Sequence, residues 1–183
     1  MQVLKEKLYS IEEYWKLCSD DPYVELIDGV LYNMSPPSRI HQKILGYIFT
    51  RISNYIEKTN SICEVYPAPF AVQLSQDEDT IVEPDISVIC DPKKLTDRGC
   101  VGAPDFIVEV VSPSNSSHDY VRKLNKYMVA GVQEYWIVDP RDSNIYVYHF
   151  SDNETKLFSY TFQDTVKSKL YNDLAIDFSK LLL

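Results

Sequence analysis

The feature that most limits how this chain folds is a short apolar run that contains one acid. Residues 106–111 read Phe-Ile-Val-Glu-Val-Val, so both alternating faces of a strand are apolar except at Glu109. This pattern is typical of a central strand that is covered on both sides. An ionised carboxylate there is costly to desolvate unless a cation, a metal ion or several hydrogen-bond donors compensate it. We therefore expect Glu109 to lie in the middle of a sheet and to have a partner.

A second acid occupies a similar setting upstream. Asp85 follows Glu83-Pro84 and belongs to a strand expected at 81–90. If this strand lies next to the strand of Glu109, the two carboxylates converge on one divalent ion. Carboxylate oxygens suit Mg²⁺, with Mn²⁺ as a substitute. Such an ion polarises a phosphoryl oxygen and lowers the pKa of an attacking water, so the pair of acids indicates phosphoester chemistry.

The remaining patterns predict an α/β or α+β fold with a mixed sheet. A strand at 106–111, a helix over 118–130 and a strand at 134–139 form a βαβ unit, whose two strands are parallel or flank one another. With 183 residues and 45% hydrophobic content, the chain suits one domain over 1–183. The other expected elements are a helix from Ser10 to about Leu17, a hairpin turning at Asp28-Gly29, a long helix through Ile48, strands at 62–74 and 81–90, and a hairpin at 145–150 and 156–162. Within 81–90, Pro84 implies an edge, a bulge or a strand that begins at that point.

The charge of the chain is acidic overall but segregated. A net charge of −9 argues against a generally basic surface that coats nucleic acid. Between Gln73 and Asp91 there are six acids and no Lys or Arg, whereas Arg122, Lys123 and Lys126 cluster on one short segment. A local basic patch therefore remains compatible with a nucleic-acid partner.

Cysteine spacing and the N-terminus predict the compartment. Cys18, Cys63, Cys90 and Cys100 form no C-x-x-C pair, so we expect unpaired thiols and neither a zinc ribbon nor a disulfide framework. No apolar run is long enough to span a membrane, and the mixed charges of the N-terminus are unlike a signal peptide. We therefore expect a cytoplasmic protein without a membrane partner.

The helix predicted after Glu109 offers three cations, and geometry selects one of them. At about 100° per residue, only Lys123 flanks the apolar stripe centred on Leu124. Its stem can lie along Tyr127 and deliver the ammonium toward the sheet, whereas Arg122 and Lys126 are expected to point to solvent. A cation beside the acids would stabilise negative charge that develops on a phosphate.

Several runs of the sequence carry a family resemblance. They are Val24-Glu25-Leu26-Ile27-Asp28-Gly29, Met34-Ser35-Pro36, His41-Gln42, Glu83-Pro84-Asp85-Ile86, Gly102-Ala103-Pro104-Asp105, Glu109-Val110-Val111-Ser112-Pro113-Ser114, Asp119, Lys123, Tyr127, Ala130-Gly131-Val132 and Glu134-Tyr135-Trp136-Ile137-Val138-Asp139-Pro140. Over most of the chain they resemble the Uma-two family of the restriction-endonuclease-like superfamily, which has the PD-(D/E)XK active site. The resemblance implies a mixed central sheet flanked by helices, an N-terminal hairpin, and a Mg²⁺-dependent nuclease acting on nucleic acid, with DNA favoured. It also implies a homodimer, because nucleases of this type commonly dimerise to reach both strands.

The resemblance also implies roles for individual residues. Asp85 matches the first acid of the motif and Glu109 the second, with the carbonyl of Val110 as a further metal ligand. The superfamily places a lysine two residues after the second acid, but this chain has Val111 there. The resemblance implies a lysine supplied by the following helix at Lys123, the residue that the helical wheel also selects.

Two further matches are weaker. Glu25 matches the acid of the family's hairpin and would act through a second metal ion or a water, although it also suits a pair across its own hairpin. His41 matches the start of a helix, where a lone histidine is more often a packing residue than a ligand. Asp105 is expected to have a structural role at the entry of its strand.

Ordinary structural roles compete with the catalytic ones. Asp85 can accept backbone N–H groups at the start of a strand, and Glu109 can form a buried ion pair with Lys123. The protein would then be a catalytically silent binding or regulatory module that keeps the fold. Its fourteen tyrosines and acidic pI suit a surface that binds partners better than one that coats DNA. A metal-dependent hydrolase of a small phosphoester is a third alternative.

Overall fold

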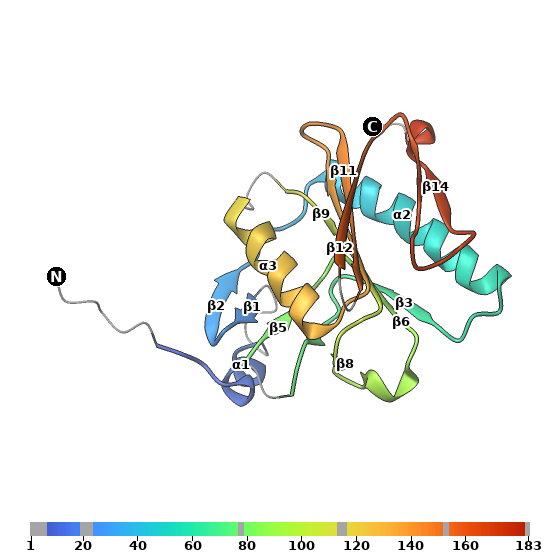
Figure 1. Cartoon of the computed structure of the whole chain (residues 1–183). Helices are drawn as coiled ribbons and strands as arrows, with labels where there is room; N and C mark the ends of the chain where they lie inside the picture. Colours follow the sequence, from blue (N-terminus) through green and yellow to red (C-terminus); the bar gives the residue numbers. More distant parts are fainter. Residues whose placement is uncertain (1–6, 19–23, 77–78, 113–116, 152–153, 182–183) are drawn as a thin grey trace.

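A six-stranded mixed sheet forms the centre of the molecule (Figure 1). The computed structural model describes residues 7–18, 24–76, 79–112, 117–151 and 154–181. The central sheet has the order β12-β11-β10-β9-β6-β3. Its strands are β3 (Glu64–Pro67), β6 (Ile86–Ile89), β9 (Phe106–Val110), β10 (Glu134–Asp139), β11 (Asn144–Ser151) and β12 (Glu154–Thr161). β9 lies between β6 and β10, as expected for a strand that is apolar on both faces.

Two strand pairings position the candidate acids. β9 and β10 are parallel, and α3 (Ser117–Ala130) connects them, which confirms the predicted βαβ unit. β6 and β9 are antiparallel, with Ile86 opposite Val108. The next step of this register places Asp85, which immediately precedes β6, beside Glu109.

The helix α2 (Arg39–Lys58) covers one face of the central sheet. Its residues Ile44, Ile48 and Ile52 are fully buried against a core that includes Val108 and Trp136. The side chain of Ser38 caps the helix and accepts a hydrogen bond from the backbone N–H of His41 at 3.2 Å. His41, in the first turn of α2, contacts Asp85 at 3.0 Å, so the N-terminus of α2 lies near the end of the sheet that carries Asp85.

The opposite face of the central sheet is covered by α3 and by a second sheet. The second sheet has the order β2-β1-β5-β4-β8-β7. Its strands are β1 (Val24–Ile27), β2 (Val30–Asn33), β4 (Val72–Gln73), β5 (Ile81–Val82), β7 (Leu95–Thr96) and β8 (Gly99–Val101), and η1 (Pro92–Lys94) precedes β7. Ile107 and Val111 belong to the core on this side. Glu109 alternates with them and therefore faces α3 and the second sheet.

The N-terminal elements follow the sequence prediction closely. α1 (Ile11–Leu17) begins with the capping box of Ser10 and Glu13, and its Tyr14 packs on the outer face of the second sheet. β1 and β2 form the expected hairpin, in which Asp28 and Gly29 have φ angles of 53° and 76°. These positive angles are those of the predicted tight turn.

The two strands predicted at 62–74 and 81–90 are each divided between the two sheets. β3 and β4 are separated by a segment that contains Pro69, and β5 and β6 are separated by Pro84. Proline has no N–H to donate, so a ladder is interrupted there. The prediction of one strand was wrong for 62–74. For 81–90, Pro84 predicts an edge, a bulge or the start of a strand, and β6 begins two residues after it, which brings Asp85 to the junction of the two sheets.

The prediction of unpaired thiols was wrong for two of the four cysteines. Cys63 and Cys90 form a disulfide across 27 residues of sequence. They lie one step beyond the pair Glu64 and Ile89 in the antiparallel ladder of β3 and β6, so they face each other directly. Spacing along the chain cannot reveal such a pairing. Cys18 and Cys100 are outside any disulfide.

The C-terminal segment returns to the face that α2 covers. It contains β13 (Thr165–Lys167), β14 (Ala175–Asp177) and η2 (Phe178–Lys180), and Val166, Ile176 and Phe178 join the core of α2. The whole arrangement is the mixed α+β class that the sequence predicts. Among the described residues, no helix is both long and apolar enough to cross a membrane.

Candidate active site

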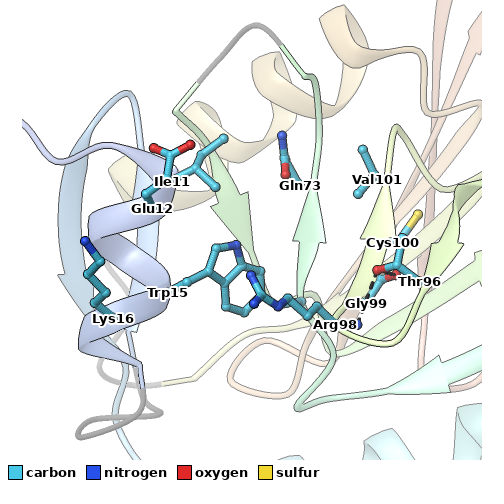
Figure 2. A pocket seen from close by; sticks show the side chains of 11 residues that line it. Ile11, Glu12, Trp15, Lys16, Gln73, Thr96, Arg98, Gly99, Cys100 and Val101 are labelled. Atoms are coloured by element: carbon cyan, nitrogen blue, oxygen red, sulfur yellow. Dashed lines mark hydrogen bonds between the residues drawn. The ribbon is translucent and has the colours of Figure 1, made fainter.

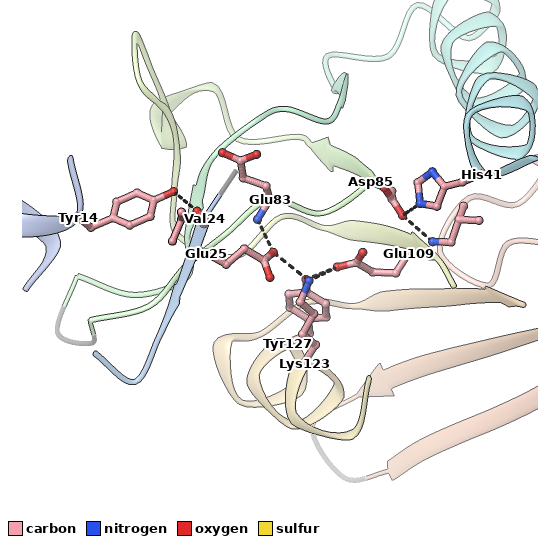
Figure 3. Close-up of polar contacts among 10 residues, drawn as sticks. Tyr14, Val24, Glu25, His41, Glu83, Asp85, Glu109, Lys123 and Tyr127 are labelled. Atoms are coloured by element: carbon pink, nitrogen blue, oxygen red, sulfur yellow. Dashed lines mark hydrogen bonds and ion pairs between the residues drawn. The ribbon is translucent and has the colours of Figure 1, made fainter. Parts of the chain in front are cut away.

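A lysine and two acids from three elements meet at the junction of the two sheets (Figure 3). The ammonium of Lys123, on α3, donates to Oε1 of Glu25 on β1 at 2.9 Å and to Oε1 of Glu109 on β9 at 3.2 Å. All three residues are buried, with 4%, 3% and 5% of their surface exposed. The structure thus joins Glu109 and Lys123, which the sequence selects, to Glu25, which the sequence gives as a weaker candidate.

Two further donors complete the network around the carboxylates. The hydroxyl of Tyr127 donates to Oε1 of Glu109 at 2.8 Å, and the backbone N–H of Glu83 donates to Oε1 of Glu25 at 2.9 Å. Tyr127 lies one helical turn after Lys123 on α3, so both side chains point to the same side. The sequence predicts only that Tyr127 packs against the stem of Lys123. Its role as a hydrogen-bond donor to Glu109 is visible only in the structure.

The other two cations of α3 contact the hairpin instead of pointing to solvent. Lys126 forms an ion pair with Asp28, and the guanidinium of Arg122 lies 4.7 Å from the centroid of the Tyr32 ring. The expectation of solvated side chains was therefore wrong for both. The reason is that β1 and β2 lie beside α3, an arrangement that a helical wheel alone does not include.

Asp85 occupies the start of β6, next to Glu109. Its Oδ2 accepts the backbone N–H of Val110 at 2.7 Å and Nε2–H of His41 at 3.0 Å. The ring of His41 is buried, and within the described part of the chain its Nδ1 has no hydrogen-bond partner. The structure thus brings His41 to the candidate site, where sequence reasoning left its role open. Val110 contacts Asp85 through its N–H, and its carbonyl as a metal ligand stays a prediction.

Burial dominates the electrostatics of the site. Burial raises the pKa of Glu109 to about 7, Lys123 opposes this shift, and the charges of Asp85 and Glu25 reinforce it. Burial and the charge of Glu25 also raise the pKa of Glu83 to about 7, although its carboxylate points away from Lys123 (Figure 3). Each of these two carboxyl groups therefore gains or loses its proton near neutral pH.

The histidine beside Asp85 titrates under two opposing influences. Burial lowers the pKa of His41, but the hydrogen bond and the charge of Asp85 raise it, and the net shift is upward. The charged form of His41 is thus favoured by its partner. In that form both ring nitrogens carry a proton, and Nε2 remains a donor to Asp85.

Asp85 and Glu109 each keep one carboxylate oxygen that is available to a divalent ion. Oδ2 of Asp85 and Oε1 of Glu109 accept the hydrogen bonds, whereas their second oxygens accept none from the residues that the structure describes. Within those same ranges, no group of three His, Cys, Asp or Glu residues forms a cage for a metal ion. Mg²⁺ is usually held by one or two carboxylates, and water and substrate phosphates supply the other ligands. The chemistry of this pair therefore fits Mg²⁺ in an open site.

Asp105 lies in a separate, structural set of contacts. Its Oδ2 accepts the backbone N–H of Cys90 at 2.8 Å, and its Oδ1 accepts the side-chain N–H of Gln133 at 3.0 Å. It therefore joins the end of β6 to the start of β10. This agrees with the structural role expected for Asp105.

Comparison with known proteins places the chain in a family. Residues 11–179 match the family model Uma2, which is described as "Putative restriction endonuclease". The chain belongs to the Uma2 family. An uncharacterized protein of Synechocystis sp., slr1290, is 27% identical over 147 residues, which are 79% of this chain and 76% of that protein.

A solved structure shares the fold of this Uma2 family member. It is the crystal structure of a protein from Anabaena variabilis that is described as a "putative nuclease belonging to DUF820". The two chains are 24% identical, with a TM-score of 0.75, and the match covers 94% of this chain and 99% of the other. The match shows a common fold over nearly the full length of both chains.

Proposed function

We propose that the protein is a Mg²⁺-dependent nuclease that hydrolyses phosphodiester bonds of nucleic acid, with DNA as its substrate. The observation that carries the proposal is the position of Lys123, whose ammonium bridges Glu25 and Glu109 beside Asp85. The motif lysine is absent at Val111, and a cation from the following helix supplies the same charge. The description of the Uma2 family and the fold of the Anabaena protein support the assignment.

Each residue of the network has a distinct role in this proposal. Asp85 and Glu109 hold Mg²⁺, for which Mn²⁺ can substitute, and the carbonyl of Val110 adds a ligand. When bound, the ion supplies polarisation of the phosphoryl oxygen and a lower pKa for the attacking water. Lys123 orients that water or neutralises charge that develops on the phosphate. Glu25 keeps the ammonium in place through its 2.9 Å hydrogen bond.

Cleavage of a panel of DNA and RNA substrates tests the proposal. Asp85→Asn and Glu109→Gln are expected to lower Mg²⁺-dependent cleavage by about two orders of magnitude, because each removes a charged metal ligand. The matched control is Lys126→Gln, which alters a cation on the same helix outside the network and is expected to keep activity. Cleavage by Asp85→Asn at the rate of the unaltered protein refutes the proposal, provided that circular dichroism shows both proteins folded.

A catalytically silent binding module is the second candidate, and one observation favours it. Lys123 and Tyr127 already satisfy Oε1 of Glu109, so the network is compensated without a metal ion. Calorimetric titration with Mn²⁺ separates the two functions. A nuclease binds Mn²⁺ and loses that binding in Asp85→Asn. A silent module binds none, or binds equally with and without the substitution.

A further inference from the structure

A second concave site lies on the outer face of the second sheet (Figure 2). It is a cavity of about 530 Å³ between α1 and the hairpin of β7 and β8. Its floor includes Gln73 of β4 and Ala71, which precedes β4, and its walls include Trp15 and Arg98. Glu25 and the neighbours of Glu109 face the other side of this sheet, so the cavity is separate from the candidate active site.

The cavity exists because α1 covers only part of the sheet. Tyr14 packs on Leu26 and Ile81, which belong to β1 and β5. On β4 the buried Val72 alternates with Gln73, whose side chain faces the cavity. Among the residues that the structure describes, no helix covers the outer surface of β4 and β8, which forms the cavity floor.

A glycine allows the two floor strands to approach closely. A Cβ atom at Gly99 would lie 2.1 Å from the carbonyl oxygen of Ala71, and the φ angle there is +136°. The backbone N–H of Cys100 donates to that same oxygen at 2.9 Å. The close spacing of this part of the floor is thus fixed by backbone contacts.

The walls combine an aromatic face with positive charge. The guanidinium of Arg98 lies 5.5 Å from the centroid of the Trp15 ring, and Figure 2 shows the two side chains together at one side of the cavity. Arg98 is exposed, and no ion pair joins it to another of the described residues. Lys16 adds a second cation to the cavity lining. Glu12 is the acidic residue among the described residues that line the cavity.

These features select one chemical class of ligand. A tryptophan face and an arginine plane stack flat heteroaromatic rings, and a guanidinium binds phosphate through paired hydrogen bonds. A volume of about 530 Å³ lies within the range of small-ligand sites. A nucleotide has both the flat ring and the phosphate, so it satisfies the aromatic wall and the cation at once.

We propose that this cavity is a nucleotide-binding site, in which the base stacks on Trp15 and the phosphate binds Arg98. The site lies outside the network of Glu25, Glu109 and Lys123 and does not depend on the proposed nuclease activity. Its ligand is a free nucleotide or an unpaired nucleotide of a nucleic-acid strand, which share the same base and phosphate.

Tryptophan fluorescence tests this site directly because the chain contains only two tryptophans. Trp15 is partly exposed in the cavity wall, whereas Trp136 is fully buried and donates from Nε1 to Glu134 at 2.6 Å. The probes are AMP, adenosine, inorganic phosphate and an oligothymidylate, all in the presence of EDTA so that no strand is cleaved. Saturable quenching by AMP or by the oligothymidylate is expected, and adenosine is expected to bind about tenfold more weakly than AMP.

Three substitutions and one matched control make the result specific. Arg98→Gln is expected to weaken the binding of AMP about tenfold, to the level of adenosine. Trp15→Phe is expected to abolish the quenching, because it removes the tryptophan that reports binding. Glu12→Gln is expected to strengthen AMP binding because it removes a negative charge near the phosphate. Arg122→Gln is the matched control, since this arginine lies over another aromatic ring, that of Tyr32, and it is expected to leave AMP binding unchanged.

The outcomes separate the two sources of the ligand and can overturn the site. Quenching by AMP alone assigns a free nucleotide, and quenching by the oligothymidylate alone assigns an unpaired strand. The indole cross-peak of Trp15 in an NMR spectrum is expected to shift while that of Trp136 stays fixed. No quenching with about 1 mM of either probe, or binding that Arg98→Gln leaves unchanged, overturns the proposal.

Discussion

At the scale of single residues, Glu109 sets the behaviour of the candidate active site. Its carboxylate is buried, and burial raises its pKa to about 7 even though Lys123 opposes the shift. A metal ion must therefore compete with a proton at this oxygen pair. This competition links the stability of the metal-free protein to pH near neutrality.

The stability of the metal-free protein is expected to fall as pH rises toward neutrality. The folded pKa of Glu109, about 7, lies above its ordinary value of 4.5, so between these values the native state binds more proton than the unfolded state. The free energy of unfolding then decreases with rising pH over this window. Urea unfolding in EDTA from about pH 5 to about pH 8 measures it, with Glu109→Gln as the reference. A difference between the two proteins that does not change with pH contradicts the prediction.

Local periodicity explains which residues of the site the sequence reveals. The alternation along β9 places Glu109 correctly, and the helical wheel of α3 places Lys123 correctly. The hydrogen bond of His41 to Asp85 joins residues 44 positions apart, on α2 and before β6. No local period relates such residues, so this contact is visible only in the structure.

At the scale of elements, α3 is attached to the N-terminal hairpin by three cations. Lys123 reaches Glu25 in β1, Lys126 reaches Asp28 in the turn, and Arg122 lies over Tyr32. The first contact is buried, whereas the second is partly exposed, because 60% of the Asp28 side chain is in solvent. The two ion pairs therefore contribute unequally to stability.

Substitution of the two lysines is expected to reveal this inequality. Lys123→Met leaves Glu25 and Glu109 buried without their cation, which is expected to lower the free energy of unfolding by about 3–5 kcal/mol. Lys126→Met removes a partly exposed pair and is expected to cost about 1 kcal/mol or less. Urea unfolding of both variants in EDTA measures the difference. Equal losses would contradict the assignment of a buried, compensated network at Lys123.

The prediction of secondary structure from the sequence fails where one apolar segment is divided between two sheets. The predicted helices and hairpins are present, because capping boxes, turn residues and helical stripes are local signals. The strand at 62–74 is predicted whole because both of its halves are apolar, whereas Pro84 marks the break within 81–90. Only the packing of two sheets against each other assigns β5 to one sheet and β6 to the other.

At the scale of the whole molecule, long-range links hold the central sheet and the C-terminal segment together. The disulfide of Cys63 and Cys90 joins the residue before β3 to the residue after β6, at the end of β6 that is away from Asp85. Glu134, in the predicted strand β10, is fully buried, and four donors surround its carboxylate. A single domain, a homodimer and a cytoplasmic location stay predictions at this scale.

The four donors of Glu134 show why this acid is structural despite its burial. Nε1–H of Trp136 donates to Oε1 at 2.6 Å. The hydroxyl of Ser168 and the backbone N–H groups of Lys169 and Leu170 donate to Oε2 at 3.0, 2.7 and 2.6 Å. The carboxylate therefore joins β10 to the segment that leads to β14. No cation is needed, because hydrogen bonds compensate the charge.

Glu134→Gln is expected to loosen the C-terminal segment while sparing the candidate active site. The amide replaces one acceptor oxygen by a donor, so at least one buried donor loses its partner, at a cost of about 1–3 kcal/mol. Hydrogen exchange is expected to accelerate at the backbone N–H groups of Lys169 and Leu170, where the free energy of local opening falls. Glu154→Gln, at the exposed edge strand β12, is the matched control and is expected to change neither quantity. If Glu134→Gln keeps full protection at both N–H groups, Glu134 does not hold this segment, and its burial requires another cause.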